Sequence, residues 1–434
     1  MTRSVLISGG GIAGPSLAYW LGTSGYAVTV VERAPGLRTS GAAPVDFRGD
    51  QLALLERMGV LDDIRGSQTG MGDQTVIDAS GRRLSTFPSV LFSGDVEIER
   101  GDLARILYNR SAGAAEYVFG DHVTGMTQDA DGVDVTFAHG APRRFDLVVG
   151  ADGLHSAVRR LAFGEEPQFR YDLGLCVAGF DVPNTFGLDH GGLIYNEPGR
   201  LVMVASGRDR ARAAVCLMFT ASPPDCDWRD TDGQKQIVAE HFADVGWQAP
   251  ALLAALRDAP ELYFDTISQI RLGHWSAGRV VLLGDAAWCT GPGGNGTGHA
   301  MLGAYTLAGE LAVAGGDHAA AYERYEQIMR RPVTKSQKTA AGAGRFLTPA
   351  TERKIRSRNR TFRILSSSVM IGLFGWLAKR TANTGSLRDY PLNGLPGPVP
   401  AGQPSPGSAR IAAPPCGQIR PLPEPAGCSP AVGT

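Results

Sequence analysis

Three glycines near the N-terminus constrain the fold of this chain more than any other feature. Gly9, Gly11 and Gly14 form the pattern Gly-x-Gly-x-x-Gly between an apolar, β-prone stretch and a segment with apolar residues one helical turn apart. In a strand–turn–helix unit, the first glycine permits the tight turn, the second lets a ligand approach the backbone, and the third lets helix and strand pack closely. The pattern predicts a Rossmann-type dinucleotide site, with a pyrophosphate at the helix N-terminus.

The segment after this turn supports the same interpretation. Gly25 ends the predicted helix, and residues 27–31 have the apolar character of a buried parallel strand. Glu32 closes that strand, where a carboxylate is suited to accept hydrogen bonds from a ribose. A glycine-rich turn without a ligand would not explain this acid, so we predict a bound dinucleotide. The motif alone does not separate FAD from NAD.

Composition excludes several classes of function. The 434 residues carry 42 basic and 43 acidic side chains, for a formal net charge of −1. Without a concentrated basic face, nucleic acid is not expected as a partner. The eight histidines and six cysteines show no metal-ligand spacing, so no metal is predicted, and free thiols indicate a reducing compartment. The first strand begins within a few residues of Met1, leaving no room for a secretory signal, so we predict a cytoplasmic protein.

The order of predicted elements indicates an α/β fold. It combines a Rossmann-type domain of parallel sheet and helices, an inserted antiparallel-sheet domain for the substrate, and a C-terminal helix. The predicted boundaries are 1–170 for the first part of the nucleotide domain, 171–270 for the inserted domain, 271–345 for the return, 346–390 for a helical segment, and 391–434 for a disordered tail rich in Pro and Gly. Apolar residues on strands of the inserted domain would form a pocket wall or ordinary core: Phe180, Leu193, Tyr195, Met203, Met218 and Phe219.

The C-terminal apolar stretch, residues 364–378, is too short and too polar to span a bilayer. A helix docked across the two domains is the favoured interpretation. The basic residues at its ends leave a weak interfacial helix as the alternative.

Two later motifs follow apolar strands. Asp152 and Gly153 come directly after residues 146–150, and Gly284 and Asp285 follow the apolar run that begins at Val280. Both turns fall at the carboxyl end of a strand, the edge where open α/β sheets bind ligands. A second glycine-rich turn then leads into a helix whose N-terminus can face an electron-rich ring. Its candidate binding residues are Pro292, Gly296 and Thr297.

These three motifs, in this order over residues 4–345, resemble the FAD-dependent aromatic hydroxylases, the p-hydroxybenzoate hydroxylase-like class A flavoprotein monooxygenases. The resemblance implies that the Rossmann-type domain binds FAD. It places the ADP half on the first motif, the Asp-Gly motif near FAD and the route of NAD(P)H, and the Gly-Asp motif on the flavin chain. The residues that carry these roles are Gly9, Gly11, Gly14, Glu32, Asp152, Gly153, Gly284 and Asp285.

A narrower set of motifs is similar to tetracycline-inactivating and polyketide-tailoring monooxygenases. It consists of Glu32-Arg33, Arg38, Gly41, Val45-Asp46-Phe47 and Glu99-Arg100-Gly101-Asp102-Leu103. This likeness implies that Arg38 contacts NADPH, that Asp46 and Arg100 contact FAD, and that Arg33 belongs to the cofactor site. For Arg38, Asp46 and Arg100, a solvated loop or a surface ion pair is the alternative.

The implied activity is monooxygenation. NAD(P)H would reduce FAD, the reduced flavin would take up O2, and a C4a-hydroperoxyflavin would hydroxylate an aromatic or polyketide-like small molecule. Baeyer–Villiger or epoxidising oxygen insertion and simple dehydrogenation share the same motifs and stay open. A flavin-binding scaffold without turnover is an alternative of a different class. The sequence does not decide the substrate, nor whether the chain is a monomer or a homodimer.

The chain departs from the family pattern close to the predicted ring site. Trp288 stands where many relatives carry His or Tyr, and Gly298 and His299 stand where they often carry a small and an apolar residue. His299 is the candidate catalytic residue, because an imidazole with an ordinary pKa of about 6.5 can deprotonate a phenol. A packed histidine is the alternative. Cys289 is either a covalent anchor for the flavin or, as we favour, a packed thiol.

Overall fold

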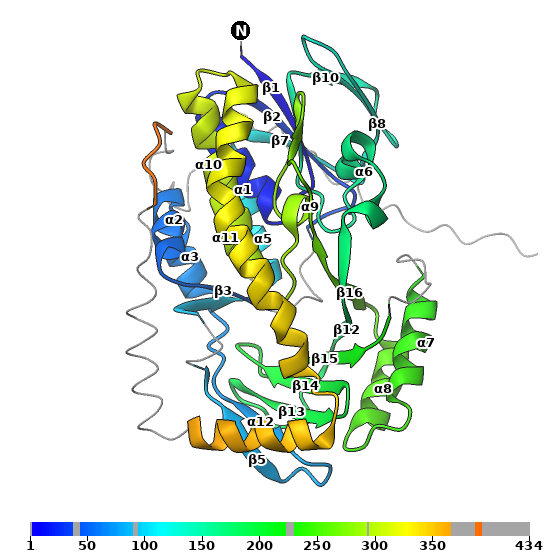
Figure 1. The fold of residues 1–434 in the computed structure, drawn as a ribbon. Helices are drawn as coiled ribbons and strands as arrows, with labels where there is room; N and C mark the ends of the chain where they lie inside the picture. The colour runs from blue at the N-terminus through cyan, green and yellow to red at the C-terminus, as the bar shows by residue number, and fades with distance from the viewer. Residues whose placement is uncertain are drawn as a thin grey trace, which may run out of the picture. The chain divides into compact units, whose positions relative to one another are not determined.

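The N-terminal glycine turn follows β1, an inner strand of a six-stranded sheet in the computed structural model (Figure 1). It therefore lies where the parallel strands have their carboxyl ends. The structure describes residues 2–37, 44–89, 94–222, 230–292, 295–365 and 387–392. The strands follow the order β17-β18-β11-β1-β2-β7, and all except β17 run parallel. Their bounds are β1 Ser4–Ser8, β2 Ala27–Glu32, β7 Ala115–Phe119, β11 Leu147–Gly150, β17 Ser276–Ala277 and β18 Val280–Leu282. The apolar runs are buried in the sheet because helices cover it, as expected for parallel strands.

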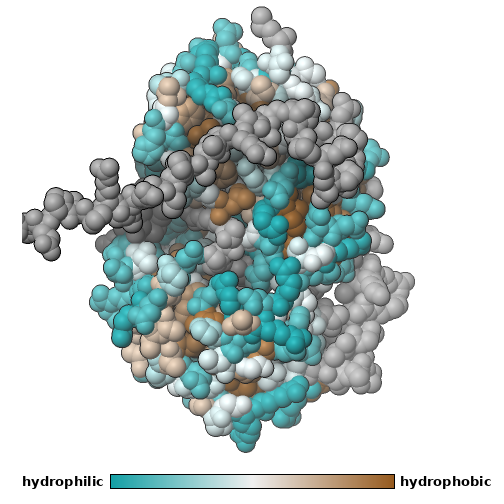
Figure 2. All heavy atoms as spheres, turned by 180° about the vertical axis from the view of Figure 1, so that it is seen from behind, coloured by the Kyte–Doolittle hydropathy of each residue, from teal (hydrophilic) through white to brown (hydrophobic). Residues whose placement is uncertain are grey.

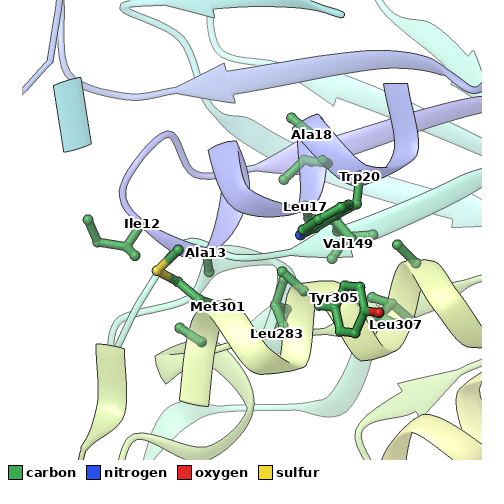
Figure 3. Close-up of a cluster of buried hydrophobic side chains, with 14 of the residues drawn as sticks. Ile12, Ala13, Leu17, Ala18, Trp20, Val149, Leu283, Met301, Tyr305 and Leu307 are labelled. Carbon is green, nitrogen blue, oxygen red and sulfur yellow. The ribbon is translucent and has the colours of Figure 1, made fainter. Parts of the chain in front are cut away.

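Four long helices pack with this sheet: α1 Ala13–Thr23, α5 Arg100–Ser111, α10 Gly296–Val313 and α11 His318–Leu347. Helix α1 packs between α5 and α10, and α10 in turn packs on α11. Figure 3 shows the core between α1 and α10, where the Trp20 and Tyr305 rings meet edge-on with centroids 5.0 Å apart. Leu283 and Val149, from neighbouring strand ends, fill the space beneath them. The core therefore holds α1 and α10 side by side.

Smaller elements surround the sheet. They are the sheet of β8 Val123–Gln128, β9 Val133–Phe137 and β10 Arg143–Phe145; the pair β3 Val45–Phe47 and β6 Val96–Ile98; and the helices α2 Asp50–Met58, α3 Leu61–Gly66, α6 Ala157–Phe163, η1 Glu166–Gln168 and α9 Asp285–Trp288. The helices α6 and α9 directly follow the two Asp-containing motifs, so each motif begins a helix.

A second sheet of seven strands has the order β16-β12-β15-β14-β13-β4-β5. Its bounds are β4 Gln74–Ile77, β5 Arg83–Phe87, β12 Arg170–Pro183, β13 Gly191–Glu197, β14 Arg200–Ser206, β15 Arg212–Thr220 and β16 Tyr263–Ile270. The five strands from the predicted inserted domain pair antiparallel, as expected. The hairpin β4–β5 comes from the segment assigned to the first domain, and β4 pairs parallel with β13. The sheet is therefore mixed, and two of its strands, β4 and β5, come from residues 74–87, outside the predicted inserted domain.

The two faces of this sheet have different partners. Helices α7 Thr231–Phe242 and α8 Ala249–Asp258 cover one face, where Phe180, Tyr195 and Phe219 are buried. Met203 and Met218 lie on the opposite face. Side chains alternate between the two faces of a strand. The predicted pocket residues therefore fall into two groups, one packed under α7 and α8 and one on the opposite face of the sheet.

The C-terminal helical segment is described in part. Helix α12 Glu352–Leu365 lies on β5, where Phe362 packs on Phe87 with ring centroids 4.4 Å apart. Residues 366–386 of the predicted segment, and residues 393–434 of the predicted tail, lie outside the described residues. Within the described ranges, no helix has the length and hydrophobicity needed to cross a membrane. On the face shown in Figure 2, hydrophobic side chains surface in small groups among hydrophilic ones, which is ordinary for a protein surface.

Residues 387–392 pack on helices α10 and α2. The Tyr390 ring lies directly on Gly309, where an added Cβ would come within 2.2 Å of the ring. The Tyr390 hydroxyl donates to Oε1 of Glu310 at 2.7 Å, and Glu310 is only 3% exposed. Arg57 pairs with Asp389 at 2.6 Å. This short segment therefore covers the Glu310 carboxylate on α10 and donates a hydrogen bond to it.

We expect Tyr390→Phe to lower the free energy of unfolding by about 2 kcal/mol, because a buried carboxylate loses its hydroxyl donor. Thermal and urea unfolding of the full chain would measure the loss. Tyr171→Phe, which changes an exposed ring, is the matched control and should unfold like the wild type. Equal unfolding of the Tyr390 variant and the control would contradict the assigned hydrogen bond.

Candidate active site

The glycine turn between β1 and α1 leaves an open cradle at its second glycine. Gly9 has φ +112°, and a Cβ there would lie 2.4 Å from the carbonyl oxygen of Ala151. A Cβ on Gly14 would lie 1.9 Å from the Gly9 carbonyl oxygen, whereas a Cβ on Gly11 would meet nothing within 4 Å. Helix α1 starts beside this space with no side-chain cap and no acid in its first turn. Its free N–H groups are therefore available to an anion.

Glu32 holds its carboxylate beside this turn. One oxygen accepts from the Gly10 N–H at 2.7 Å, and the other accepts from the Ala34 N–H at 2.9 Å. Each carboxylate oxygen can accept a further hydrogen bond, so a ribose hydroxyl fits here. Arg33 follows with an exposed side chain, and Arg38 lies outside the described residues.

The Asp-Gly motif begins helix α6. The Asp152 carboxylate accepts from the backbone N–H groups of Ala157 and Val158 at 2.9 and 3.1 Å, and from the Ser156 hydroxyl. Gly153 has φ +81°, a conformation that favours glycine. The structure thus gives Asp152 a helix-capping role, and its predicted place near FAD and NAD(P)H stays a prediction.

The Gly-Asp motif lies between the starts of α1 and α10. A Cβ on Gly284, which has φ +66°, would lie 3.2 Å from the Cβ of Ala13 and 3.5 Å from that of Ala300. Burial raises the pKa of the Asp285 carboxyl, and the charge of Arg100 opposes this shift. A Cβ on Gly296 would lie 3.6 Å from Oδ1 of Asp285, so the first residue of α10 adjoins the carboxylate.

Helix α10 also begins with no side-chain cap and no acid in its first turn. Pro292 and Thr297 are half-buried around this start, and residues 293–294 lie outside the described residues. A second uncapped helix N-terminus therefore faces the same edge as the first, and both can stabilise negative charge.

The separation of Glu32 and Asp285 suits one extended dinucleotide. They follow the carboxyl ends of β2 and β18, which are three strand spacings apart in the sheet. At about 4.8 Å per spacing, this is roughly 14 Å along the sheet edge. The three motifs are joined by contacts between Gly9 and Ala151 and between Gly284 and Ala13. One edge of the sheet thus presents a ribose acceptor, two uncapped helices and a buried acid, a donor set that fits FAD.

Two predicted FAD contacts lie at the rim of this edge. Arg100 is the exposed first residue of α5. Asp46, on β3, pairs with Arg48 at 3.0 Å and is partly exposed. The charge of Arg100 acts on Asp285 of the Gly-Asp motif, and β3, which carries Asp46, contacts α10. Both FAD contacts stay predictions.

Arg159 is a site residue that the sequence reasoning did not single out. Its side chain is fully buried and donates to the carbonyl oxygens of Leu154 at 2.6 Å and Ala286 at 3.0 Å, and to Glu166 at 2.8 Å. It therefore ties the Asp-Gly motif to the Gly-Asp motif. The available signal was its position three residues after Ser156, a residue type that often begins a helix.

His155 links the Asp-Gly motif to the second sheet. Its Nδ1 lies 3.0 Å from Oε1 of Glu166, and its Nε2 lies 3.5 Å from Oδ1 of Asp265 on β16. Hydrogen bonds to Asp265 and Glu166 raise the pKa of His155 to about 9. The imidazole is therefore charged at neutral pH and joins two acids from different parts of the fold.

Stability should depend on the charge of His155. Because its pKa is higher in the folded than in the unfolded chain, its contribution is complete below about pH 6.5 and is lost as the pH rises through about 9. We expect the melting temperature of the wild type to exceed that of His155→Gln at pH 6 and the difference to shrink by pH 9.5. His274→Gln, at a side chain 88% exposed, is the control. A difference that stays constant with pH would argue against this ion pair.

The structure describes the surroundings of three residues near the predicted ring site. Trp288 is 1% exposed and packs on Trp275 with ring centroids 4.5 Å apart, so its side chain points into the core and does not shape the ring site. The Cys289 thiol donates to the Ser268 carbonyl oxygen at 3.3 Å, and burial raises its pKa, as for a packed thiol. A Cβ on Gly298 would lie 2.0 Å from Nε2 of Gln51, so a larger residue there would displace the Gln51 side chain.

His299 is buried on α10, 8% exposed. Its Nε2 lies 2.6 Å from the Ser336 hydroxyl, and its Nδ1 has no partner among the described residues. Burial lowers its pKa to about 4, so the imidazole is neutral at physiological pH. A neutral imidazole with so low a pKa is a weak base, and the predicted proton transfer from a phenol stays a prediction.

The fold and the site together define a FAD-dependent oxidoreductase. Residues 2–338 match the family model described as FAD binding domain, and the chain belongs to that family. The predicted fold class, the resemblance to flavin-dependent monooxygenases and the cofactor FAD are confirmed.

Relatives and solved structures agree with this family. The chain is 42% identical over 342 residues to an uncharacterized protein of Mycobacterium tuberculosis, covering 77% of this chain and 92% of that one. It is 35% identical over 339 residues to a flavin-dependent monooxygenase of Legionella longbeachae, covering 77% and 87%. Among solved structures, tetracycline destructase Tet(51) superposes with a TM-score of 0.77 at 30% identity, and Tet(55) with 0.76 at 32%; each comparison covers 90% of this chain and 99% of the other.

Proposed function

We propose that this protein is an NAD(P)H-dependent flavin monooxygenase that hydroxylates an aromatic or polyketide-like small molecule. The observation that carries the proposal is a sheet edge whose residues fit FAD, with the apolar Leu173 of the second sheet beside the loop after α9. Relatives named flavin-dependent monooxygenases and the tetracycline destructase structures support the same activity. Bound FAD, once reduced, supplies the activation of O2.

The protein's own task is to hold a planar substrate near the flavin and to exclude water. Leu173 contacts the loop after α9, since a Cβ on Gly291 would lie 3.1 Å from its Cδ1. Val177 and Met203, also partly buried, lie on the same side of the second sheet, away from α7 and α8. The end of this apolar face at Leu173 adjoins the loop after α9, and an apolar surface there suits a large ring system and restricts water around the reacting atoms.

The purified protein should be yellow, and it should consume NADPH and O2 faster when a suitable aromatic compound is present. Tetracycline is the first probe, followed by simple phenols. Mass spectrometry with isotope-labelled O2 should find one labelled oxygen atom in the product. A protein that stays colourless on addition of FAD would refute the proposal, and so would NADPH oxidation that never yields an oxygenated product with any probe.

The same product identifies the alternatives. Baeyer–Villiger insertion or epoxidation also adds one labelled oxygen, but at a ring carbonyl or a double bond, which NMR of the product distinguishes from a hydroxyl group. A dehydrogenase product carries no label and has lost two hydrogen atoms.

Two residue roles belong to this proposal. Arg38→Ala should raise the NADPH concentration needed for half-maximal rate and keep FAD bound. If that NADPH concentration does not change, Arg38 does not contact NADPH.

His299→Gln should slow turnover at every pH if His299 positions or deprotonates the substrate. Full activity of a FAD-loaded His299→Gln variant would leave His299 as a packed residue.

A further inference from the structure

Tyr263, the first residue of β16, presents an open aromatic ring. The residue is 43% exposed, although most large apolar side chains of the described residues are buried. Among the described residues no aromatic or cationic side chain stacks on the Tyr263 ring, so the ring is available for contact with another flat ring.

The register of β16 decides which way this ring faces. Tyr263 pairs opposite Gly179 of β12, and Asp265 pairs opposite Val177. Residues two apart on a strand share a face, so Tyr263 lies on the same side as Asp265. Asp265 reaches His155 of the Asp-Gly loop, and α9 packs beside β16 (Figure 1). Tyr263 therefore faces the FAD-binding edge, and its cross-strand neighbour Gly179 has no side chain that could cover it.

Charged residues of both parts of the fold act on the phenol. The surrounding protein raises the pKa of Tyr263, the carboxylates of Asp265 and Asp285 raise it further, and the charge of Arg100 opposes them. Arg100 begins α5 and Asp285 begins α9, so the Tyr263 phenol lies within electrostatic reach of two elements of the FAD-binding part of the fold. The phenol stays protonated at neutral pH and adds no charge there.

We propose that the exposed ring of Tyr263 packs against the isoalloxazine ring of bound FAD and forms the side of the ring site that the glycine motifs leave open. Offset or edge-on contact between aromatic rings is favourable, and an electrically neutral wall does not repel an electron-rich ring. The second sheet thus contributes a cofactor contact through β16, in addition to its role in holding the substrate. The inference depends on FAD binding and not on the proposed reaction.

Time-resolved fluorescence of FAD in the full-length holoprotein tests this contact. A tyrosine in contact with an excited flavin quenches it by electron transfer, whereas phenylalanine of the same shape is not an electron donor. We expect the fastest component of flavin decay to be lost in Tyr263→Phe and to return in Tyr263→Trp, because tryptophan also donates. Tyr171→Phe, at another exposed tyrosine, is the matched control and should decay like the wild type.

The proposal is overturned if FAD-loaded Tyr263→Phe decays like the wild type, or if Tyr171→Phe loses the fast component equally. Absorbance confirms equal FAD loading in each sample, so altered folding is not mistaken for altered quenching. No substrate or NADPH enters this measurement. A failure of monooxygenation with every probe would therefore leave the quenching result readable, and the two proposals fail separately.

Discussion

A Gly11→Val variant is expected to fold normally and to lose FAD. A Cβ at this position would meet nothing within 4 Å, and Gly11 does not have a positive φ, so the protein itself tolerates a side chain. The same space adjoins the uncapped N-terminus of α1, where the backbone must receive a pyrophosphate. We expect FAD affinity to fall at least ~100-fold, equivalent to about 2.8 kcal/mol. Flavin absorbance after gel filtration and titration with FAD would measure the loss.

Gly113→Val is the matched control. Gly113 also has open space around an added Cβ, but it lies in the turn before β7, at the opposite end of the parallel strands. It should keep FAD and the wild-type melting temperature of the apoprotein. If Gly11→Val binds FAD as tightly as Gly113→Val does, the cofactor does not cross the glycine turn, and the assignment of the FAD cradle fails.

Replacing Arg159 with methionine is expected to destabilise the protein by about 3 kcal/mol, because removal of a buried charge leaves its partners uncompensated. In the wild type, the Arg159 guanidinium donates hydrogen bonds to two carbonyl oxygens and to the Glu166 carboxylate. These bonds join the Asp-Gly loop to α9, so FAD affinity should fall together with the melting temperature. Both quantities can be measured on the same protein by thermal unfolding with and without added FAD.

Arg160→Met provides the comparison, since Arg160 is the exposed neighbour on the same helix. Its substitution should change stability by no more than about 0.5 kcal/mol. Equal melting temperatures for the two variants would show that the buried bonds of Arg159 contribute nothing measurable.

The local features of this protein could be predicted from its sequence because they depend on neighbouring residues. The spacing of Gly9, Gly11 and Gly14 dictates a turn into a helix, and Glu32 marks the end of the following strand. Apolar runs at 146–150 and after Val280 indicated parallel strands with acids at their ends. The structure places all of these motifs at one edge of the sheet. Chain geometry over a few residues determines such features, whatever the rest of the fold does.

Contacts between distant segments decided the remainder. The hairpin β4–β5 joins a sheet formed mostly by residues about 100 positions later, and the inward orientation of Trp288 depends on Trp275 and Tyr325. Sequence alternation alone did not tell which face of β15 meets α7, so Phe219 and Met218 were grouped together although they point apart. The roles inferred for Arg159 and Tyr263 depend on neighbouring elements that are distant in the sequence. Burial is a property of the assembled chain, because the partners that exclude water from a side chain come from elsewhere in the sequence.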